Sequence, residues 1–203
     1  MKNKAQLLLI CVCCILSFEA FSQTEWKLDK NKDGIKVYTR IKENSDFKAF
    51  KATMTVGAST DEILKILKET VRYTKWYGYT KTATLLKQEK NVQYNYVETI
   101  FPWPFKNRDM VYKMTTLKLN NNSIKISLEG IPDYIQEKKG IIRMKKAEGY
   151  ILLQPSGNTT EIIYIFHSEP GDNIPAWLAN SSIAKLPFKT MYGLRKTVEE
   201  KNI

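Results

Sequence analysis

The sequence contains a long series of short stretches in which apolar and polar residues alternate, followed by one predicted terminal helix. This order constrains the fold more than any other feature. Between residues 34 and 167, apolar and polar residues alternate over short distances, as they do in strands with one buried face. Polar segments such as residues 120–122 and 155–158 separate the stretches and favour hairpins and tight loops. The predicted strands are residues 34–40, 50–56, 82–88, 92–100, 110–119, 123–129, 141–153 and 160–167.

Two helices are predicted in this β-rich chain. Ser59 or Thr60 caps the first, Glu62 completes a capping box, and apolar residues at helical spacing continue it toward Trp76. The second is a long amphipathic helix over residues 175–201, for which Pro187 predicts a kink. Such a helix buries its apolar stripe best on the concave face of a curved sheet. The sequence therefore predicts an α+β fold in which a curved antiparallel β-sheet wraps around a long C-terminal α-helix.

The first 22 residues have the three parts of a secretory signal peptide. Lys2 and Lys4 precede an apolar run over residues 5–18, and a small-x-small cleavage site ends at Ser22. A membrane anchor needs about 20 apolar residues, and this run is shorter. A lipoprotein signal is disfavoured because a valine, not a small residue, precedes Cys13. We expect cleavage after Ser22 and export to the periplasm or the medium.

The mature domain, residues 23–203, contains no cysteine, because Cys11, Cys13 and Cys14 all lie in the leader. The whole chain has one histidine. Disulfides, a catalytic thiol and a Cys/His metal cluster are therefore excluded for the mature product, and no cofactor or metal is predicted. No internal repeat or long linker interrupts these residues, so we expect one domain acting as a monomer.

The chain is basic, with a net charge of +11 that becomes about +10 when the leader removes two lysines and one glutamate. A basic protein attracts nucleic acid or anionic lipid. The lysines are spread along the chain rather than gathered in a stripe, and an exported protein does not meet nucleic acid. The charge therefore favours transient contact with an anionic membrane surface over nucleic-acid binding.

Several segments spread over almost the whole mature chain form a distinctive series. They are Trp26, Lys32-Asp33-Gly34-Ile35-Lys36-Val37-Tyr38-Thr39-Arg40, Tyr73-Thr74-Lys75-Trp76-Tyr77, Pro102-Trp103-Pro104-Phe105-Lys106-Asn107-Arg108-Asp109-Met110-Val111-Tyr112 and Ile174-Pro175-Ala176-Trp177-Leu178-Ala179-Asn180. Together and in this order, they resemble the START family, the steroidogenic-acute-regulatory-related lipid-transfer domains. The resemblance implies a helix-grip fold enclosing an apolar tunnel that holds one lipid-like molecule. It also implies lipid binding and transfer without catalysis.

Strand parity and the stripe of the last helix predict which side chains face the tunnel. Tyrosines, including Tyr73 and Tyr77, are the candidates for polar contacts, because a ring can pack in an apolar wall while its hydroxyl binds a headgroup. Ordinary core packing is the alternative for every candidate. The predicted ligand-binding residues are Tyr94, Tyr96, Met110, Tyr112, Met114, Ile126, Leu128, Tyr164, Phe166, Trp177, Ala184, Phe188 and Met191.

The adjacent charges Arg108 and Asp109 suggest acid–base chemistry, but neighbouring strand residues point to opposite faces and cannot act on one ligand. The resemblance implies a structural role that fastens the 102–106 loop to the sheet. Some relatives carry an acidic residue and an arginine inside the tunnel, at positions that hold Asn95 and Met114 here. This departure argues against a sterol-type polar contact.

An enzyme of the polyketide cyclase or aromatase type is the alternative function, because helix-grip domains also carry such chemistry. It needs a pair of acid–base residues in the tunnel, and the sequence offers none; His167 reads as a surface or strand-end residue. For ligand exchange we expect a lid made of the terminal helix and the 102–106 loop. Trp103 and Phe105 of that loop are suited to enter a membrane interface.

Overall fold

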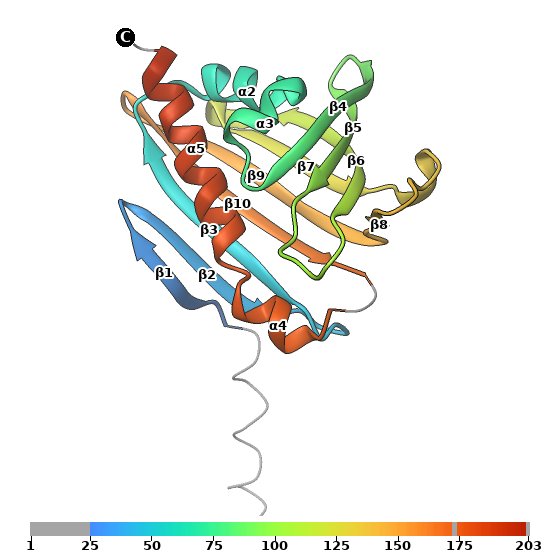
Figure 1. The fold of residues 1–203 in the computed structure, drawn as a ribbon. Helices are drawn as coiled ribbons and strands as arrows, with labels where there is room; N and C mark the ends of the chain where they lie inside the picture. Colours follow the sequence, from blue (N-terminus) through green and yellow to red (C-terminus); the bar gives the residue numbers. More distant parts are fainter. Residues whose placement is uncertain (1–24, 172–173, 202–203) are drawn as a thin grey trace, which may run out of the picture.

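The computed structural model describes residues 25–171 and 174–201 (Figure 1). The predicted leader lies outside the described residues. Within them, the strands form one ten-stranded sheet in the order β1-β2-β3-β10-β9-β7-β6-β5-β4, while β8 pairs with β6 off this path. The pairs along the path are antiparallel, and β8 runs parallel to β6. The strands are β1 (Lys27–Lys32), β2 (Ile35–Ile41), β3 (Lys48–Val56), β4 (Thr80–Glu89), β5 (Val92–Thr99), β6 (Arg108–Lys118), β7 (Ile124–Gly130), β8 (Ile142–Arg143), β9 (Lys146–Ser156) and β10 (Thr159–Glu169).

The helix predicted over residues 59–76 is present in three pieces. Its start is as expected, because the Ser59 side chain accepts from the backbone of Glu62 and the Glu62 side chain accepts from the backbone of Ser59. The backbone leaves the helical region at Glu69, with φ −81° and ψ 62°, and this ends the first piece. The pieces are α2 (Thr60–Lys68), the 3₁₀ turn η1 (Thr70–Arg72) and α3 (Tyr73–Trp76). Further 3₁₀ turns are η2 (Asn120–Asn122) and η3 (Pro132–Tyr134).

The predicted arrangement of sheet and terminal helix is confirmed. Alternate residues of β3 and β10 are buried on the concave face, and α5 (Lys185–Lys201) crosses that face (Figure 1). The helix buries Met191, Leu194 and Val198, each less than 4% exposed. Burial of side chains of this size stabilises the fold by about 1.5–3 kcal/mol each. The core therefore lies between α5 and the concave face of the sheet.

The long helix predicted over residues 175–201 is two helices, α4 (Ala176–Ser181) and α5. The break lies at residues 182–184, ahead of the predicted kink at Pro187. Pro187 is the third residue of α5, where its missing N–H has no intrahelical acceptor to lose. In a helix that began earlier, the proline ring would clash with the carbonyl group four residues before it. Pro187 therefore fixes the start of α5 rather than bending its middle.

Two strand predictions differ from the structure. The edge strand β1 was not predicted, because its KLDKNK sequence is polar on both faces. The stretch 141–153 divides into β8 and β9, because β8 turns to pair with β6, where Arg143 lies opposite Asp109. The backbone N–H of Met144 donates to the carbonyl of Asp109 at 2.9 Å and completes this interruption.

A close contact fixes the middle of α5 against α3. A Cβ atom at Gly193 would lie 2.2 Å from the carbonyl oxygen of Trp76, which is too near for any residue but glycine. Beside it, the backbone N–H of Gly78 donates to the Thr190 hydroxyl at 3.0 Å. The two contacts hold the middle of α5 in place over the sheet.

Candidate ligand-binding cavity

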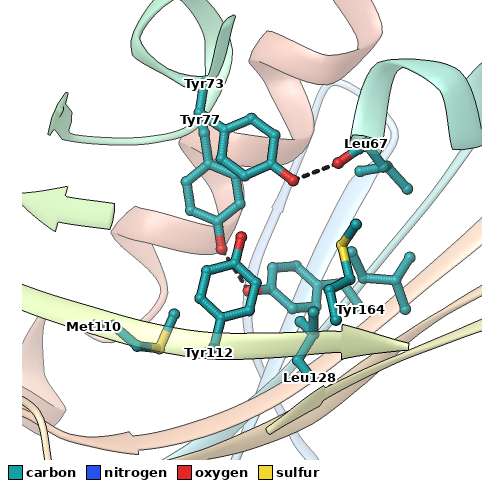
Figure 2. Close-up of a pocket in the computed structure, with 9 residues that line it drawn as sticks. Leu67, Tyr73, Tyr77, Met110, Tyr112, Leu128 and Tyr164 are labelled. Carbon is teal, nitrogen blue, oxygen red and sulfur yellow. Dashed lines mark hydrogen bonds between the residues drawn. The ribbon is translucent and has the colours of Figure 1, made fainter. Parts of the chain in front are cut away.

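A small cavity lies between the concave face of the sheet and the α2–α3 segment (Figure 2). Strands β6, β7, β9 and β10 supply one wall, and the end of α2, α3 and the residue after α3 supply the other. The lining is aliphatic, methionine and tyrosine side chains. The lining residues are Leu67, Tyr73, Tyr77, Met110, Tyr112, Met114, Leu128, Ile151 and Tyr164.

The cavity is closed in this structure. Its volume is about 20 Å³, which is roughly the space that one water needs. Sites for small organic ligands occupy about 300–1,000 Å³. Side chains therefore fill most of the space between the sheet and the α2–α3 segment, and a lipid-sized molecule would require the lining to move outward.

Four tyrosine hydroxyls converge on this small space. The hydroxyls of Tyr77 and Tyr164 are hydrogen-bonded at 2.6 Å, joining the residue after α3 to β10 (Figure 2). The hydroxyl of Tyr73 donates to the carbonyl of Leu67. Tyr112 places its hydroxyl against that of Tyr73, with which it interacts. The cavity wall is therefore mostly apolar, with four tyrosine hydroxyls gathered at one point.

Burial keeps these phenols protonated. Desolvation raises the pKa of Tyr77 to about 12. The pKa values of Tyr73, Tyr112 and Tyr164 are also raised, first by burial and then by their tyrosine neighbours. None of the nine lining residues among the described ones is Asp, Glu, Lys, Arg or His. The cavity wall therefore offers hydrogen-bond donors and acceptors without charge.

Comparison with known proteins assigns the chain to a family. The family model described as START domain matches residues 16–202. The chain belongs to the START domain family. A protein of Pseudomonas aeruginosa that has no assigned function is 36% identical over 178 residues, which are 87% of this chain and 88% of that protein. The phosphatidylcholine transfer protein of the mouse is 26% identical over 176 residues, 83% of this chain and 81% of the relative.

A solved structure gives the same assignment for this START domain. The STAR-related lipid transfer protein of Xanthomonas axonopodis, a fragment, superposes with a TM-score of 0.82 at 34% identity. The superposition covers 86% of this chain and 98% of the fragment. The helix-grip fold expected from the sequence is therefore shown.

Five predicted ligand residues line the cavity of this START domain: Met110, Tyr112, Met114, Leu128 and Tyr164. Four others are buried in the core around it without lining it: Ile126, Phe166, Ala184 and Met191. Phe188 packs at the edge of the core, with the ammonium of Lys30 3.9 Å from its ring centroid. The strand residues among these, in β6, β7 and β10, lie on the concave face of the sheet, as strand parity predicted.

Tyr94 and Tyr96 are not brought to the cavity, and the expectation for them needs correction. In the β5–β6 register, Asn95 lies opposite Tyr112 on the concave side, so the two tyrosines point to the other face of the sheet. Tyr94 stacks on Tyr134 with ring centroids 4.9 Å apart. Tyr96 is covered by Lys138, whose ammonium lies 3.8 Å from the ring centroid.

Trp177 also lies away from the cavity. It belongs to α4 and is 72% exposed. The break between α4 and α5 separates it from the apolar stripe that continues in α5. Trp177 therefore belongs to the molecular surface, not to the cavity wall.

The structure adds two lining residues that the sequence reading did not select, Leu67 and Ile151. Leu67 lies on the apolar stripe of α2, and Ile151 shares the buried face of β9 with Leu153. Both patterns were visible in the sequence as core signals. Which core residue borders the cavity depends on how α2 and β9 pack against each other. The periodicity of the sequence predicts the buried face of each element but not this packing.

Arg108 and Asp109 point to opposite faces, as predicted. On the outer face, the Asp109 carboxylate binds Arg143 through Nε at 2.7 Å and Nη2 at 3.1 Å, with both side chains buried. Arg108 donates through Nε to the Pro170 carbonyl at 2.9 Å and also binds the Lys106 carbonyl. Its guanidinium lies 4.7 Å from the Phe101 ring centroid. Arg108 therefore ties the loop after β5 to the segment before α4.

A second, open cleft lies at the end of β10 and is polar. It has a volume of about 370 Å³, and its lining includes Lys42, Lys146, Glu148, His167 and Glu169. His167 is at a strand end, as expected, but it is only 6% exposed and is not a surface residue. Its Nδ1 lies 3.4 Å from the Lys48 carbonyl, and burial lowers the pKa of its imidazole.

Residues 25–171 and 174–201 hold no group of three or more His, Cys, Asp or Glu side chains arranged to bind a metal ion. Over the same residues, no helix has the length and apolarity that a membrane span needs.

Proposed function

We propose that this START domain binds one lipid or similar hydrophobic molecule in the cavity between the sheet and the α2–α3 segment and transfers it between membranes without chemical change. The observation that carries the proposal is the enclosed wall of aliphatic, methionine and tyrosine side chains on the concave face. The lipid transfer proteins of Xanthomonas and mouse to which the chain is similar support it. Removing apolar ligand surface from water yields about 25 cal/mol per Å².

Binding requires the closed cavity to expand, since its present volume of about 20 Å³ holds no acyl chain. The Gly193–Trp76 contact holds the middle of α5 against α3. We place the entrance beyond the N-terminal end of α5, between α4 and the loop over residues 100–107, which lie at the same end of the molecule in Figure 1. We propose that this loop and α4 form the lid.

Membrane contact is assigned to the same end. Trp103 in the loop is 92% exposed and Trp177 in α4 is 72% exposed. Aromatic side chains of this kind favour the membrane–water interface. The basic charge of the chain adds attraction to anionic lipid. Export through the leader over residues 1–22 would bring the domain to such a surface outside the cytoplasm.

A binding role is favoured over the cyclase alternative by the chemistry of the cavity. A general acid–base pair needs groups that exchange protons near neutral pH. The titratable groups that line the cavity are tyrosines whose pKa values burial raises further from neutrality. Within the described residues, the wall supplies no such pair.

Native mass spectrometry of the protein expressed with its leader, followed by organic extraction, tests the proposal. We expect a one-to-one complex whose extra mass is recovered as a lipid. Met114→Arg places a charge in the cavity and should abolish the adduct, while Thr115→Arg adds the same side chain on the opposite face and should keep it. Leu128→Phe fills the cavity with an apolar side chain and serves if Met114→Arg does not fold. Folded wild-type protein that carries no lipid and takes up none from vesicles would overturn the proposal.

A further inference from the structure

The hydroxyl groups in the cavity wall need an explanation beyond packing. Phenylalanine would fill nearly the same space as tyrosine and would need no hydrogen-bond partner. Instead, four tyrosines meet at one point, where Tyr77 bonds Tyr164 and Tyr73 bonds the Leu67 carbonyl. A phenol both donates and accepts, so an entering hydroxyl can take the place of one tyrosine, and an entering carbonyl can accept from both Tyr77 and Tyr164, without leaving a buried partner unsatisfied. The cluster is therefore suited to exchange its internal hydrogen bonds for bonds to a ligand.

The same cluster is unsuited to a charged group. A buried phosphate needs a cation beside it, because an unpaired charge in an apolar site loses its hydration without compensation. No lining residue among the described ones carries a positive charge, and the raised pKa values leave the phenols neutral.

The nearest buried cations have other bonds. Arg108 donates to the carbonyls of Pro170 and Lys106, and Arg143 forms its ion pair on the outer face of the sheet. Neither side chain lines the cavity. A phosphate held at the tyrosines would therefore have no positive partner in the wall.

The rings are also poorly placed to bind a quaternary ammonium by their faces. Tyr73 and Tyr77 are stacked on each other, with centroids 5.2 Å apart and planes 14° from parallel, so each covers a face of the other. Tyr164 and Phe50 form a T-shaped pair, with ring centroids 5.0 Å apart and planes at 90°. Figure 2 shows the hydroxyl ends of Tyr77, Tyr112 and Tyr164 directed toward one another in the cavity. The cavity presents hydroxyls, not ring faces.

We propose that the ligand's buried polar group is uncharged, a hydroxyl, carbonyl or ester oxygen, and that Tyr73, Tyr77, Tyr112 and Tyr164 bind it. The ligand class is then a neutral lipid with one hydrogen-bonding end, in place of a phospholipid. This inference rests on the proposed binding function and adds the chemistry of the ligand to it.

A competition among lipids with identical acyl chains tests the inference. Delipidated full-length mature protein is mixed with vesicles containing equal amounts of 1,2-dioleoylglycerol, dioleoylphosphatidic acid and dioleoylphosphatidylcholine. The protein is then reisolated and its lipid quantified. The phosphatidic acid headgroup is small but charged, so it separates the effect of charge from that of size. We expect dioleoylglycerol to exceed each phospholipid by about tenfold or more, which is the factor for each 1.4 kcal/mol of charge burial.

Matched variants connect the preference to the hydroxyls. Tyr112→Phe and the double variant Tyr77→Phe/Tyr164→Phe keep the rings and should reduce the preference for dioleoylglycerol severalfold. Tyr94→Phe removes a hydroxyl from the outer face of the sheet and should leave the preference unchanged. Equal or greater loading with either phospholipid, or an unchanged preference in the cavity variants, overturns the inference while the binding function stands. Uptake of none of the three lipids overturns both.

Discussion

The hydroxyl oxygens of Tyr77 and Tyr164 lie 2.6 Å apart across the cavity, although the two residues are 87 positions apart in the chain. Tyr77 follows α3, and Tyr164 stands near the middle of β10. This hydrogen bond closes the space in which we propose that the ligand sits. It therefore couples the stability of the empty protein to the groups that would bind the ligand.

A double-mutant cycle on this pair should show coupling in the lipid-free protein. Tyr77→Phe and Tyr164→Phe each remove one hydroxyl and leave the other without its partner, so each should lower the free energy of unfolding by about 1–3 kcal/mol. The double variant should cost less than the sum of the single changes. Urea unfolding measures the three values. Strict additivity would show that the two hydroxyls do not stabilise each other.

Loss of the buried ion pair between Asp109 and Arg143 should be far more costly than loss of a surface pair. Asp109→Ala leaves the guanidinium of Arg143 buried without its carboxylate, which typically costs about 3–5 kcal/mol. The control Asp61→Ala removes an exposed partner of Lys118, 2.9 Å away, and should cost less than about 1 kcal/mol. Equal shifts of the thermal midpoint in the two variants would contradict this account of Asp109.

Stability should fall over the pH range that begins near the ordinary imidazole pKa of about 6.5 and extends downward, because of His167. Burial lowers the pKa of this imidazole below its ordinary 6.5, so the unfolded chain binds a proton before the folded chain does. The stabilisation is complete above the ordinary pKa and is lost as the pH falls toward the folded value. Glu148 and Glu169 face the ring and favour its protonation, whereas Lys42 opposes it.

The pH effect is measured as the thermal midpoint of wild type and of His167→Gln across this range. The variant lacks the titrating group and should show a shallower fall. The pKa values of Glu148 and Glu169 are themselves lowered from 4.5, so these carboxylates act at more acidic pH. The same slope in both proteins would assign the effect to other groups.

The two exposed tryptophans should control membrane binding. The double variant Trp103→Ala/Trp177→Ala should bind vesicles rich in phosphatidylglycerol several-fold more weakly than wild type in a sedimentation assay. Val71→Ala, which removes a 66% exposed apolar side chain near α3, serves as the control. Added salt should weaken wild-type binding, because the attraction to anionic lipid is screened. Undiminished binding of the double variant would move the membrane contact elsewhere.

Much of the fold can be predicted from local patterns in the sequence. Alternation with a period of two predicted the inner face of β6, so Met110, Tyr112 and Met114 were placed correctly. The capping residues at Ser59 and Glu62 predicted where α2 begins. These features depend on neighbours within one element, which is why a single sequence contains them.

Other features depend on how elements meet. Tyr94 and Tyr96 were selected for their hydroxyls, but the β5–β6 register turns them to the outer face. Trp177 shares the helical spacing of the terminal stripe, yet the break before α5 places it at the surface. The small cavity volume results from the packing of side chains from six elements, and no local pattern predicts it.

The central claim is that the tyrosine-lined cavity between the sheet and the α2–α3 segment holds the lipid, and the methionine methyl groups report on it most directly. Met110 and Met114 line the cavity, and each can be assigned by its Met→Leu variant in a spectrum of protein labelled with [methyl-¹³C]methionine. Loading of delipidated protein with dioleoylglycerol should shift both signals and saturate at one lipid per chain. Saturable binding that leaves the Met110 and Met114 signals unchanged would contradict the claim.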